Sequence, residues 1–206
     1  MNRKPLFSLD HVCKRYGVIK ALSIESLVLY HEEMVLITGE NGTGKSTLLR
    51  VLGGITRISD GKVNRSIELK TKRIAFVPQY GGLYPNLSLA DNMMIWSRLY
   101  DLSEPVSGIG ELLKQLGLED SLNRKVIDLS GGQQKLAVLI SALAVAPDVL
   151  LLDEPLSGLD EIKSDVILST IAKTSKNRLL TVITAHPNLK LPFEFRRVEL
   201  PRRESY

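Results

Sequence analysis

One loop, Gly39–Thr47, restricts what this chain can fold into more than any other stretch. It reads Gly-Glu-Asn-Gly-Thr-Gly-Lys-Ser-Thr and matches the spacing G-x-x-x-x-G-K-[ST]. The mainly apolar runs Met34–Thr38 and Leu48–Leu52 flank it, so we expect a buried strand to enter the loop and a helix to leave it. Glycines let backbone N–H groups close around an anion, and the helix N-terminus adds partial positive charge. The loop therefore predicts a site for the phosphates of a nucleoside triphosphate.

Two side chains of this loop have distinct expected tasks. Lys45 should reach the β- and γ-phosphates, and the Ser46 hydroxyl should be a ligand of Mg²⁺. The residues expected to contact the nucleotide from this loop are Gly39, Asn41, Gly42, Thr43, Gly44, Lys45, Ser46 and Thr47.

The composition is that of an ordinary globular protein. The chain has 206 residues, of which 44% are apolar and 24% are charged, so we expect a single domain over residues 1–206. It has no apolar run near the roughly 20 residues of a membrane helix, and its beginning lacks the apolar core of a signal peptide. Its single cysteine, Cys13, excludes an internal disulfide, which favours a reducing cytosol. The net charge is +4, and part of it is a basic end that we expect to be solvated or to contact an anionic surface: Arg196, Arg197, Arg202 and Arg203.

Apolar strands alternate with amphipathic helices along most of the chain. Strands are expected at Leu6–Val12, Ile24–Leu29, Gly61–Val63, Ile67–Leu69, Ile74–Val77, Val149–Leu152 and Leu179–Thr184. Lys14–Gly17 reads as a turn between the first two, which suggests an antiparallel ribbon beside the nucleotide strand. Helical patterns cover Leu89–Leu99, Glu111–Leu116, a long segment from Ser130 to Pro147, and Glu161–Thr174.

This alternation predicts an α/β fold with a mainly parallel sheet and helices on both faces. Residues 1–79 and 129–206 would form the core with its antiparallel ribbon. Residues of about 80–128, which contain Gly81, Gly82, Pro85 and other breakers, would form a helical insert.

Several polar residues follow expected strand ends, where ligands bind in parallel sheets. Asp153 ends an apolar run, and its ionised carboxylate could share Mg²⁺ with Ser46. Glu154 is then the natural group to polarise an attacking water. Gln79 can reach the metal or the water through its amide oxygen, and His186 can hydrogen-bond a γ-phosphate, although in isolation each fits a structural role equally well.

Two further features fit a nucleotide. Ser130, Gly131 and Gly132 open another helix, and their exposed amides suit an anion as well as a helix cap. Two phosphate-binding surfaces in one chain suggest a nucleotide held between two copies, or two related subunits, arranged head to tail. Tyr16 could stack on a nucleobase or simply occupy a hairpin turn.

In order and spacing, these motifs resemble the ATP-binding cassette (ABC) family from Leu6 to about Leu200. They are Gly39–Thr47 (Walker A), Pro78-Gln79 (Q-loop), Leu129–Gln133 (signature), Leu150–Pro155 (Walker B), Ser157–Asp160 (D-loop) and Thr184–His186 (H-loop). The resemblance implies that Tyr16 stacks on adenine, Glu154 is the catalytic carboxylate and His186 contacts the γ-phosphate. It also implies that Ser130, Gly131 and Gly132 act on the ATP of the opposite subunit, and that the insert couples to a membrane partner.

The chain departs from the family pattern in three places. Leu136 and Ser141 stand where basic residues are common, and His31-Glu-Glu stands where a glycine often precedes the first strand of the site. After His186 there is little room for a helix. The last of these differences concerns the region after His186 that contacts the second subunit in the family.

The resemblance implies an ATPase subunit of a transporter, with ATP and Mg²⁺ as cofactors. It would work as a homodimer or heterodimer on the inner face of the cell membrane, with transmembrane subunits on a separate chain and no nucleic acid as partner. The stretch Leu83–Ser88 is similar to small exporter ATPases, which favours export. The alternatives are an ABC ATPase acting in DNA repair, chromosome organisation or translation, and a regulatory module without turnover.

Overall fold

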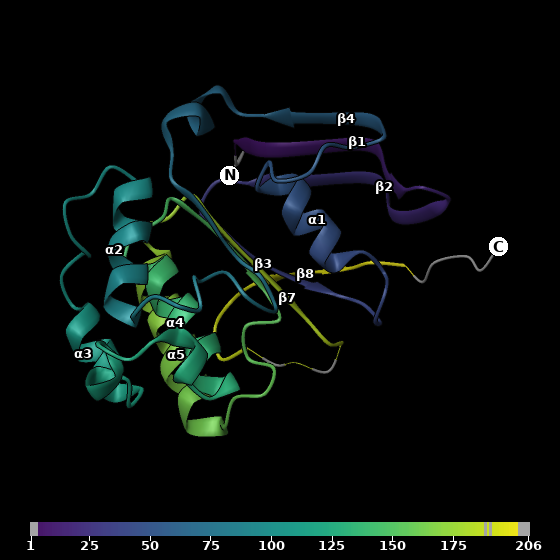
Figure 1. Ribbon diagram of the computed structural model, residues 1–206. Coiled ribbons are helices and arrows are strands. Elements are labelled where there is room, and N and C mark those ends of the chain that lie inside the picture. The colour runs from purple at the N-terminus through teal and green to yellow at the C-terminus, as the bar shows by residue number, and fades with distance from the viewer. Residues whose placement is uncertain (1–3, 188, 190, 202–206) are drawn as a thin grey trace.

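A five-stranded parallel sheet, with the strand order β5-β6-β7-β3-β8, lies at the centre of the molecule (Figure 1). The structure is a computed structural model and describes residues 4–187, 189 and 191–201. The five strands are β3 (Glu33–Thr38), β5 (Ile74–Val77), β6 (Val149–Asp153), β7 (Leu180–Ala185) and β8 (Arg196–Glu199). Every neighbouring pair in this sheet is parallel.

A second, antiparallel sheet has the order β2-β1-β4 and lies beside α1 (Figure 1). Its strands are β1 (Pro5–Tyr16), β2 (Ile19–Tyr30) and β4 (Asp60–Arg65). β1 pairs with both neighbours, and its hairpin with β2 closes at Tyr16 and Ile19.

Helices cover both faces of the parallel sheet. They are α1 (Lys45–Leu52), α2 (Leu89–Leu99), α3 (Ile109–Gln115), α4 (Gly131–Leu143) and α5 (Glu161–Ser175). Three short 3₁₀ helices span Ile67–Thr71, Glu119–Ser121 and Val126–Asp128. Within the described residues, no helix combines the length and the apolar character needed to cross a bilayer.

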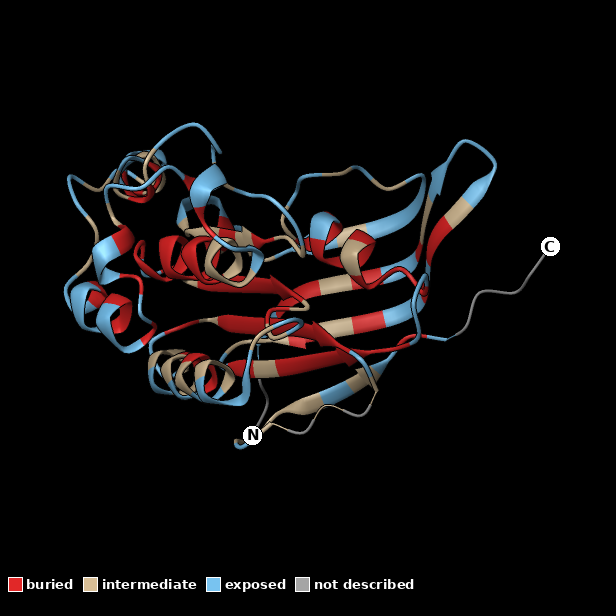
Figure 2. Ribbon diagram, turned by 60° about the horizontal axis from the view of Figure 1, so that its bottom comes forward, coloured by how far each residue is buried: buried red, intermediate tan, exposed pale blue. Residues whose placement is uncertain are grey.

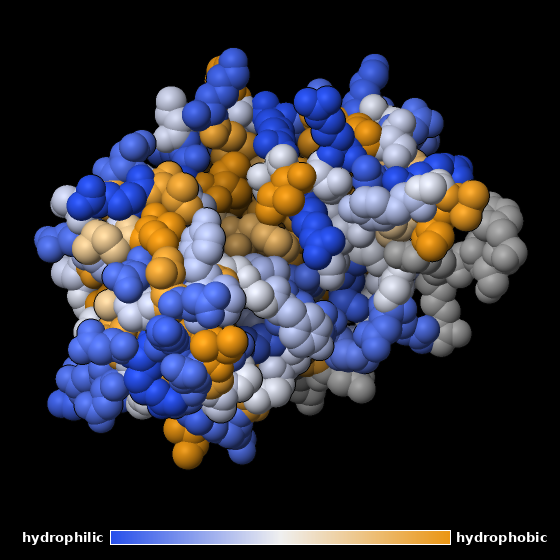
Figure 3. All heavy atoms as spheres, in the orientation of Figure 1, coloured by the Kyte–Doolittle hydropathy of each residue, from blue (hydrophilic) through white to orange (hydrophobic). Residues whose placement is uncertain are grey.

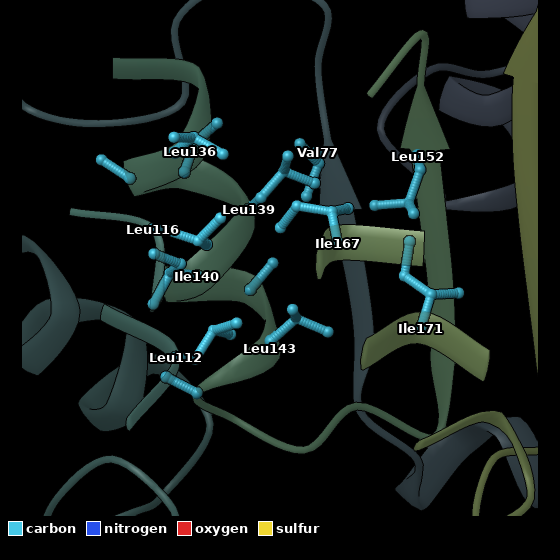
Figure 4. Packing of buried hydrophobic residues seen from close by; sticks show 14 of the residues in the cluster. Val77, Leu112, Leu116, Leu136, Leu139, Ile140, Leu143, Leu152, Ile167 and Ile171 are labelled. Carbon is cyan, nitrogen blue, oxygen red and sulfur yellow. The ribbon is translucent and has the colours of Figure 1, made fainter. Parts of the chain in front are cut away.

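Alternation along the strands divides the hydrophobic core into two layers. In β6, Val149 and Leu151 face the layer that contains α1 and the antiparallel sheet, whereas Leu150 and Leu152 face the layer that contains α2 to α5. Figure 2 shows the buried strands between these layers. In the second layer, side chains of α4 and α5 meet those of β5 and β6 (Figure 4). Burial on both faces explains why these strands are continuous apolar runs.

The predicted α/β architecture is confirmed, and most predicted elements lie within one or two residues of their expected positions. The helix expected at Leu89–Leu99 has these bounds in the structure. Ser130 is the N-cap of α4, as the capping pattern predicted. The first two strands are longer than predicted, so Tyr16 is the last residue of β1 rather than part of a turn.

The strand predicted at Ile67–Leu69 is wrong, because this segment is a 3₁₀ helix. Only Leu69 is buried there, while Ile67 is 70% exposed, so the segment has one residue rather than an alternating face to bury. The Leu69 N–H donates to the Ser66 carbonyl at 3.1 Å, which closes the helical turn. The free edge of β1 is already occupied by β4, which ends at Arg65.

The prediction of a solvated basic end is wrong for Arg196, whereas Arg197 is exposed as predicted. Arg196 and Arg197 belong to β8. Arg196 Nε lies 2.5 Å from Glu33 Oε1, and its Nη2 donates to the Val28 carbonyl at 2.7 Å. The Glu33 side chain is 4% exposed, so Arg196 compensates a buried carboxylate and ties β8 to the end of β2. Arg202 and Arg203 lie outside the described residues.

We expect Arg196→Ala to destabilise the fold because it leaves Glu33 buried without its cation. Breaking a buried pair costs about 3–5 kcal/mol, and the lower end of that range is expected here because Arg196 is partly exposed. Urea unfolding would measure the loss. Arg57→Ala removes an exposed arginine outside the sheets and should leave the midpoint nearly unchanged. Equal midpoints for the two variants would contradict this role of Arg196.

Candidate functional site

The strands of the parallel sheet end in register, and this places the predicted site residues along one edge. Thr38 at the end of β3 pairs with Ala185, and Asp153 at the end of β6 pairs with Thr184. Val77 pairs with Leu152. Gly39, Gln79, Glu154 and His186 follow these ends by one or two residues. The predicted convergence of strand ends is therefore confirmed for the backbone.

The phosphate loop is shaped by glycines at positions where a side chain would clash with the chain or strain the backbone. Gly44, the N-cap of α1, has φ 103°, and a Cβ there would lie 2.5 Å from the Ala21 carbonyl oxygen. Gly42 has φ 84°, which is costly for other residues. The loop can thus turn tightly from β3 into α1.

Lys45, the first residue of α1, folds its side chain back into the loop. Its Nζ donates to the carbonyls of Gly39 at 2.8 Å and Glu40 at 3.0 Å, and the residue is only 5% exposed. The same Nζ lies 3.7 Å from Glu154 Oε1. The ammonium is therefore held where the phosphate loop and the end of β6 approach each other.

Asp153 is held by a threonine that our sequence analysis did not single out. Its side chain is buried at 2% exposure, and the Thr184 hydroxyl donates to Asp153 Oδ1 at 2.8 Å. The oxygen of that hydroxyl also accepts from the Glu154 N–H at 2.9 Å. Thr184 thus fixes both acidic residues from the neighbouring strand. Its position two residues before His186 was the available signal.

Glu154 leaves the strand in an unusual backbone conformation. Its φ of 47° lies in the left-handed region, which is uncommon for a residue with a side chain and is often found at functional sites. The Gln79 Nε2 donates to Glu154 Oε2 at 2.9 Å. Lys45 and Gln79 therefore contact the two oxygens of one half-buried carboxylate.

The donor set at this edge suits Mg²⁺ rather than a softer metal. Asp153 supplies a carboxylate, Ser46 on α1 a hydroxyl and Gln79 an amide, all oxygen ligands. Among the described residues, no group of three or more His, Cys, Asp and Glu side chains could hold a metal ion. A cation that shares its ligands with a phosphate fits this small donor set.

Ser130–Gly132 lie at the start of α4, in the layer of helices across the sheet from α1 (Figure 1). Ser130 Oγ accepts from the Gln133 N–H at 3.3 Å, and Gln133 Oε1 accepts from the Ser130 N–H at 3.0 Å, which makes a complete capping box. No hydrogen bond found in the described chain joins these residues to the phosphate loop. Their action on a nucleotide of another subunit stays a prediction.

His186 lies at the end of β7 and Tyr16 at the end of β1, and the structure shows no hydrogen bond from either side chain to Asp153 or Glu154. His186 is exposed and comes directly after β7. Tyr16 is 46% exposed at the hairpin end of β1, and Lys14 Nζ lies 4.7 Å from its ring centroid. Their predicted contacts with the γ-phosphate and with adenine remain predictions.

Lys135 is a further residue that our sequence analysis missed. Its Nζ donates to the Ser157 carbonyl at 2.9 Å and also contacts the Ser157 hydroxyl. Burial lowers the pKa of Lys135, and the charges of Glu154 and Asp153 act in the opposite direction. Lys135 lines a cavity of about 610 Å³ that also borders Gln79 and Gly132. It therefore links α4 to the loop after β6.

Comparisons with known proteins point to the same family as the motifs at this site. Residues 22–157 match the model of a family described as ABC transporter. The uncharacterized ABC transporter ATP-binding protein YhaQ of Bacillus subtilis is 29% identical over 88% of this chain and 63% of its own length. The sulfate/thiosulfate import ATP-binding protein CysA 2 of Chromobacterium violaceum is 37% identical over 74% of this chain and 44% of its own length. This chain thus spans less than two thirds of either relative.

Two other matches cover most of both chains. The lipoprotein-releasing system ATP-binding protein LolD of Francisella tularensis is 30% identical over 82% of each chain. The dimeric structure of MJ0796, described as a bacterial ABC transporter cassette, has a TM-score of 0.74 and 28% identity over 87% of this chain and 88% of that one. With its phosphate loop, its paired strand ends and its signature helix in the expected order, the chain belongs to the ABC transporter family.

Proposed function

We propose that this protein hydrolyses ATP and that two ATPase subunits close around the nucleotide to drive transport. The observation that carries this proposal is the set of contacts at the carboxyl edge of the sheet. Lys45 and Gln79 both contact Glu154, and Thr184 joins Glu154 to Asp153. A binding module without turnover would not need this arrangement around Glu154.

Each residue has a role that follows from its position. Lys45 would exchange its two carbonyl acceptors for the β- and γ-phosphate oxygens, supported by the loop amides and the N-terminus of α1. Glu154 would accept a proton from the attacking water, with Gln79 holding its carboxylate in place. His186 would contact the γ-phosphate from the end of β7, and Tyr16 would stack on the base.

Magnesium would neutralise charge on the β- and γ-phosphate oxygens and would be held by Ser46, Asp153 and Gln79. Thr184 keeps the Asp153 carboxylate oriented for this task through its hydroxyl. An ionised carboxylate at 2% exposure gains a partner by such ligation.

The site of one chain would be completed by Ser130, Gly131 and Gly132 of a second subunit, identical or related. Their amides open α4 and are suited to a γ-phosphate. MJ0796, with which this chain shares its fold, is described as a dimer. Hydrolysis would then separate the subunits and reset the cycle.

Transmembrane subunits on a separate chain would dock on the helical insert, which would place this protein on the inner face of the membrane. The insert and the loop before it expose large apolar side chains: Tyr80 (83% exposed), Tyr84 (60%), Leu87 (37%) and Met94 (39%). Figure 3 shows hydrophobic side chains gathered over α2 and in the hollow next to it. Such a patch is typical of a protein interaction surface.

We propose export as the direction, on the basis of the stretch Leu83–Ser88 and of the coverage shared with the lipoprotein-releasing LolD. The sulfate import protein CysA 2 has a higher sequence identity to this chain than LolD does, but it is matched over less than half of its length. ATP-dependent flux into or out of inverted vesicles, after reconstitution with the membrane partner, distinguishes the two directions.

A second candidate function is ABC-type ATP hydrolysis outside transport. The structure titled RNase-L Inhibitor is 26% identical, with a TM-score of 0.73, over 89% of this chain but only 34% of that one. In the described chain the longest helix is α5 with 15 residues, so no long coiled coil interrupts the domain. Co-purification from membranes with an integral membrane protein supports transport, and co-purification with ribosomes supports the alternative.

We expect Glu154→Gln to bind ATP with near-parent affinity and to hydrolyse it at least about 100-fold more slowly, because the amide cannot take the proton from water. The variant should accumulate as an ATP-bound dimer in size-exclusion chromatography. A turnover rate equal to that of the parent would exclude Glu154 as the base.

Lys45→Ala should weaken ATP binding about 10- to 100-fold, the loss expected for charge-assisted hydrogen bonds to phosphate. Isothermal titration calorimetry measures this affinity. Lys62→Ala, which removes an exposed lysine of β4, is the matched control and should bind ATP like the parent. If both variants bind alike, the phosphate-loop assignment fails.

Mixing two inactive variants tests whether the signature acts across the dimer. Lys45→Ala and Ser130→Arg should each abolish hydrolysis alone, whereas a mixed dimer retains one site with an intact Lys45 and an intact facing Ser130. A mixture should therefore regain part of the parent rate. Activity that stays at background, while mixed dimers are seen by native mass spectrometry, would show that the two residues act within one chain.

A further inference from the structure

A second cavity, of about 340 Å³, lies between the helical insert and the core. It is at the other end of the parallel strands from the ATP site. Its apolar wall comes from α3 and the segment before it, and from the end of α4 and the segment after it, including Ile109, Leu112 and Leu143. Figure 4 shows Leu112 and Leu143 at one end of the packed helices. The cavity borders Pro147 and Arg178, which come just before β6 and β7, so it lies near the amino ends of those strands, opposite the edge that holds Glu154.

One arginine in the wall of this cavity is buried without a counter-ion among the residues that the structure describes. Arg178 is 6% exposed, and its Nη1 is fully buried with no hydrogen-bond partner. Burial lowers the pKa of Arg178 to about 10, so the guanidinium remains charged at neutral pH. No carboxylate of the described chain contributes to that shift. A buried charge of this kind is costly until an anion pairs with it.

Three other polar side chains around the cavity have partners of their own. Thr170 and Thr174 donate their hydroxyl protons to carbonyls of their own helix, Val166 at 2.8 Å and Thr170 at 2.7 Å. Glu111 is exposed, and its Oε1 accepts from the Gln115 amide at 3.0 Å. The two threonines are neutral, and Glu111 does not contribute to the pKa shift of Arg178, so these groups do not balance its charge.

We propose that this cavity binds a small organic carboxylate, which pairs with Arg178 and rests its apolar body against α3 and α4. A single guanidinium matches one carboxylate through two parallel hydrogen bonds. Arg178 is the one basic residue among those that line the cavity in the described chain, whereas a phosphate dianion calls for more positive charge. The volume lies at the lower end of the range for small-molecule sites, which limits the ligand to a short chain or a single ring.

A ligand in this position would touch α3 of the insert and the end of α5 in the core at the same time. It would therefore stabilise the folded chain by mass action and restrain the insert against the core. This effect requires neither ATP nor a second subunit, so it can be measured independently of hydrolysis.

Hexanoate is the probe, with hexanamide as its neutral counterpart and inorganic phosphate as the competing anion, at constant ionic strength. In the full chain, millimolar hexanoate should raise the melting temperature by several degrees and saturate, while hexanamide should not. Arg178→Met should abolish the shift. Without ligand, this variant should melt at the parent temperature or above it, because an unpaired buried charge has been replaced by a side chain of similar volume.

Two control variants make the result decisive. Arg57→Met, at an exposed site, should keep the full hexanoate response. Glu111→Gln should also keep it; if this variant and Arg178→Met instead both melt well below the parent, Glu111 is the counter-ion and the proposal fails. The proposal also fails if the parent shows no hexanoate shift, if Arg178→Met retains it, or if phosphate gives an equal shift that depends on Arg178.

Discussion

The common end point of the parallel strands is the constraint on which the rest of the structure depends. β3, β6 and β7 pair in register up to Thr38, Asp153 and Ala185, so residues far apart in the chain arrive at one edge. Burial of the sheet on both faces prevents any strand from slipping, because a shift of one residue would exchange the two hydrophobic layers. The precision of the site is thus a consequence of core packing.

Around this edge, the buried charged side chains each have a hydrogen-bond or ion-pair partner. Lys45 is surrounded by two carbonyls and by Glu154, and Asp153 by the Thr184 hydroxyl. Glu33 has Arg196 at the opposite end of β3. Arg178 is the contrast, since it is equally buried but has no such neighbour in the part of the chain that the structure describes. This difference in the surroundings of a buried charge distinguishes the second cavity from the ATP site.

Much of this could be predicted from the sequence, because the signals are local. Glycine spacing, apolar runs and the capping pattern at Ser130 determine the phosphate loop, the sheet and the start of α4. Thr184, Lys135 and β8 were missed because their importance depends on what lies across space. A threonine, a lysine and an arginine carry no signal in the sequence, and only the fold brings Thr184 to Asp153, Lys135 to Ser157 and Arg196 to Glu33. The 3₁₀ helix at Ile67–Thr71 was mistaken for a strand because three residues carry too little periodicity.

The left-handed conformation of Glu154 has a consequence for how two adjacent acids can have separate tasks. Along a regular strand, consecutive side chains point to opposite faces of the sheet, so one of two neighbouring carboxylates would be directed away from the nucleotide. The reversal of φ at Glu154 breaks this alternation one residue after Asp153. Asp153 can then face Thr184 while Glu154 turns towards Gln79 and Lys45. The proposed metal ligand and the proposed base can therefore be adjacent residues, and the separation of their side chains depends on the φ angle of Glu154.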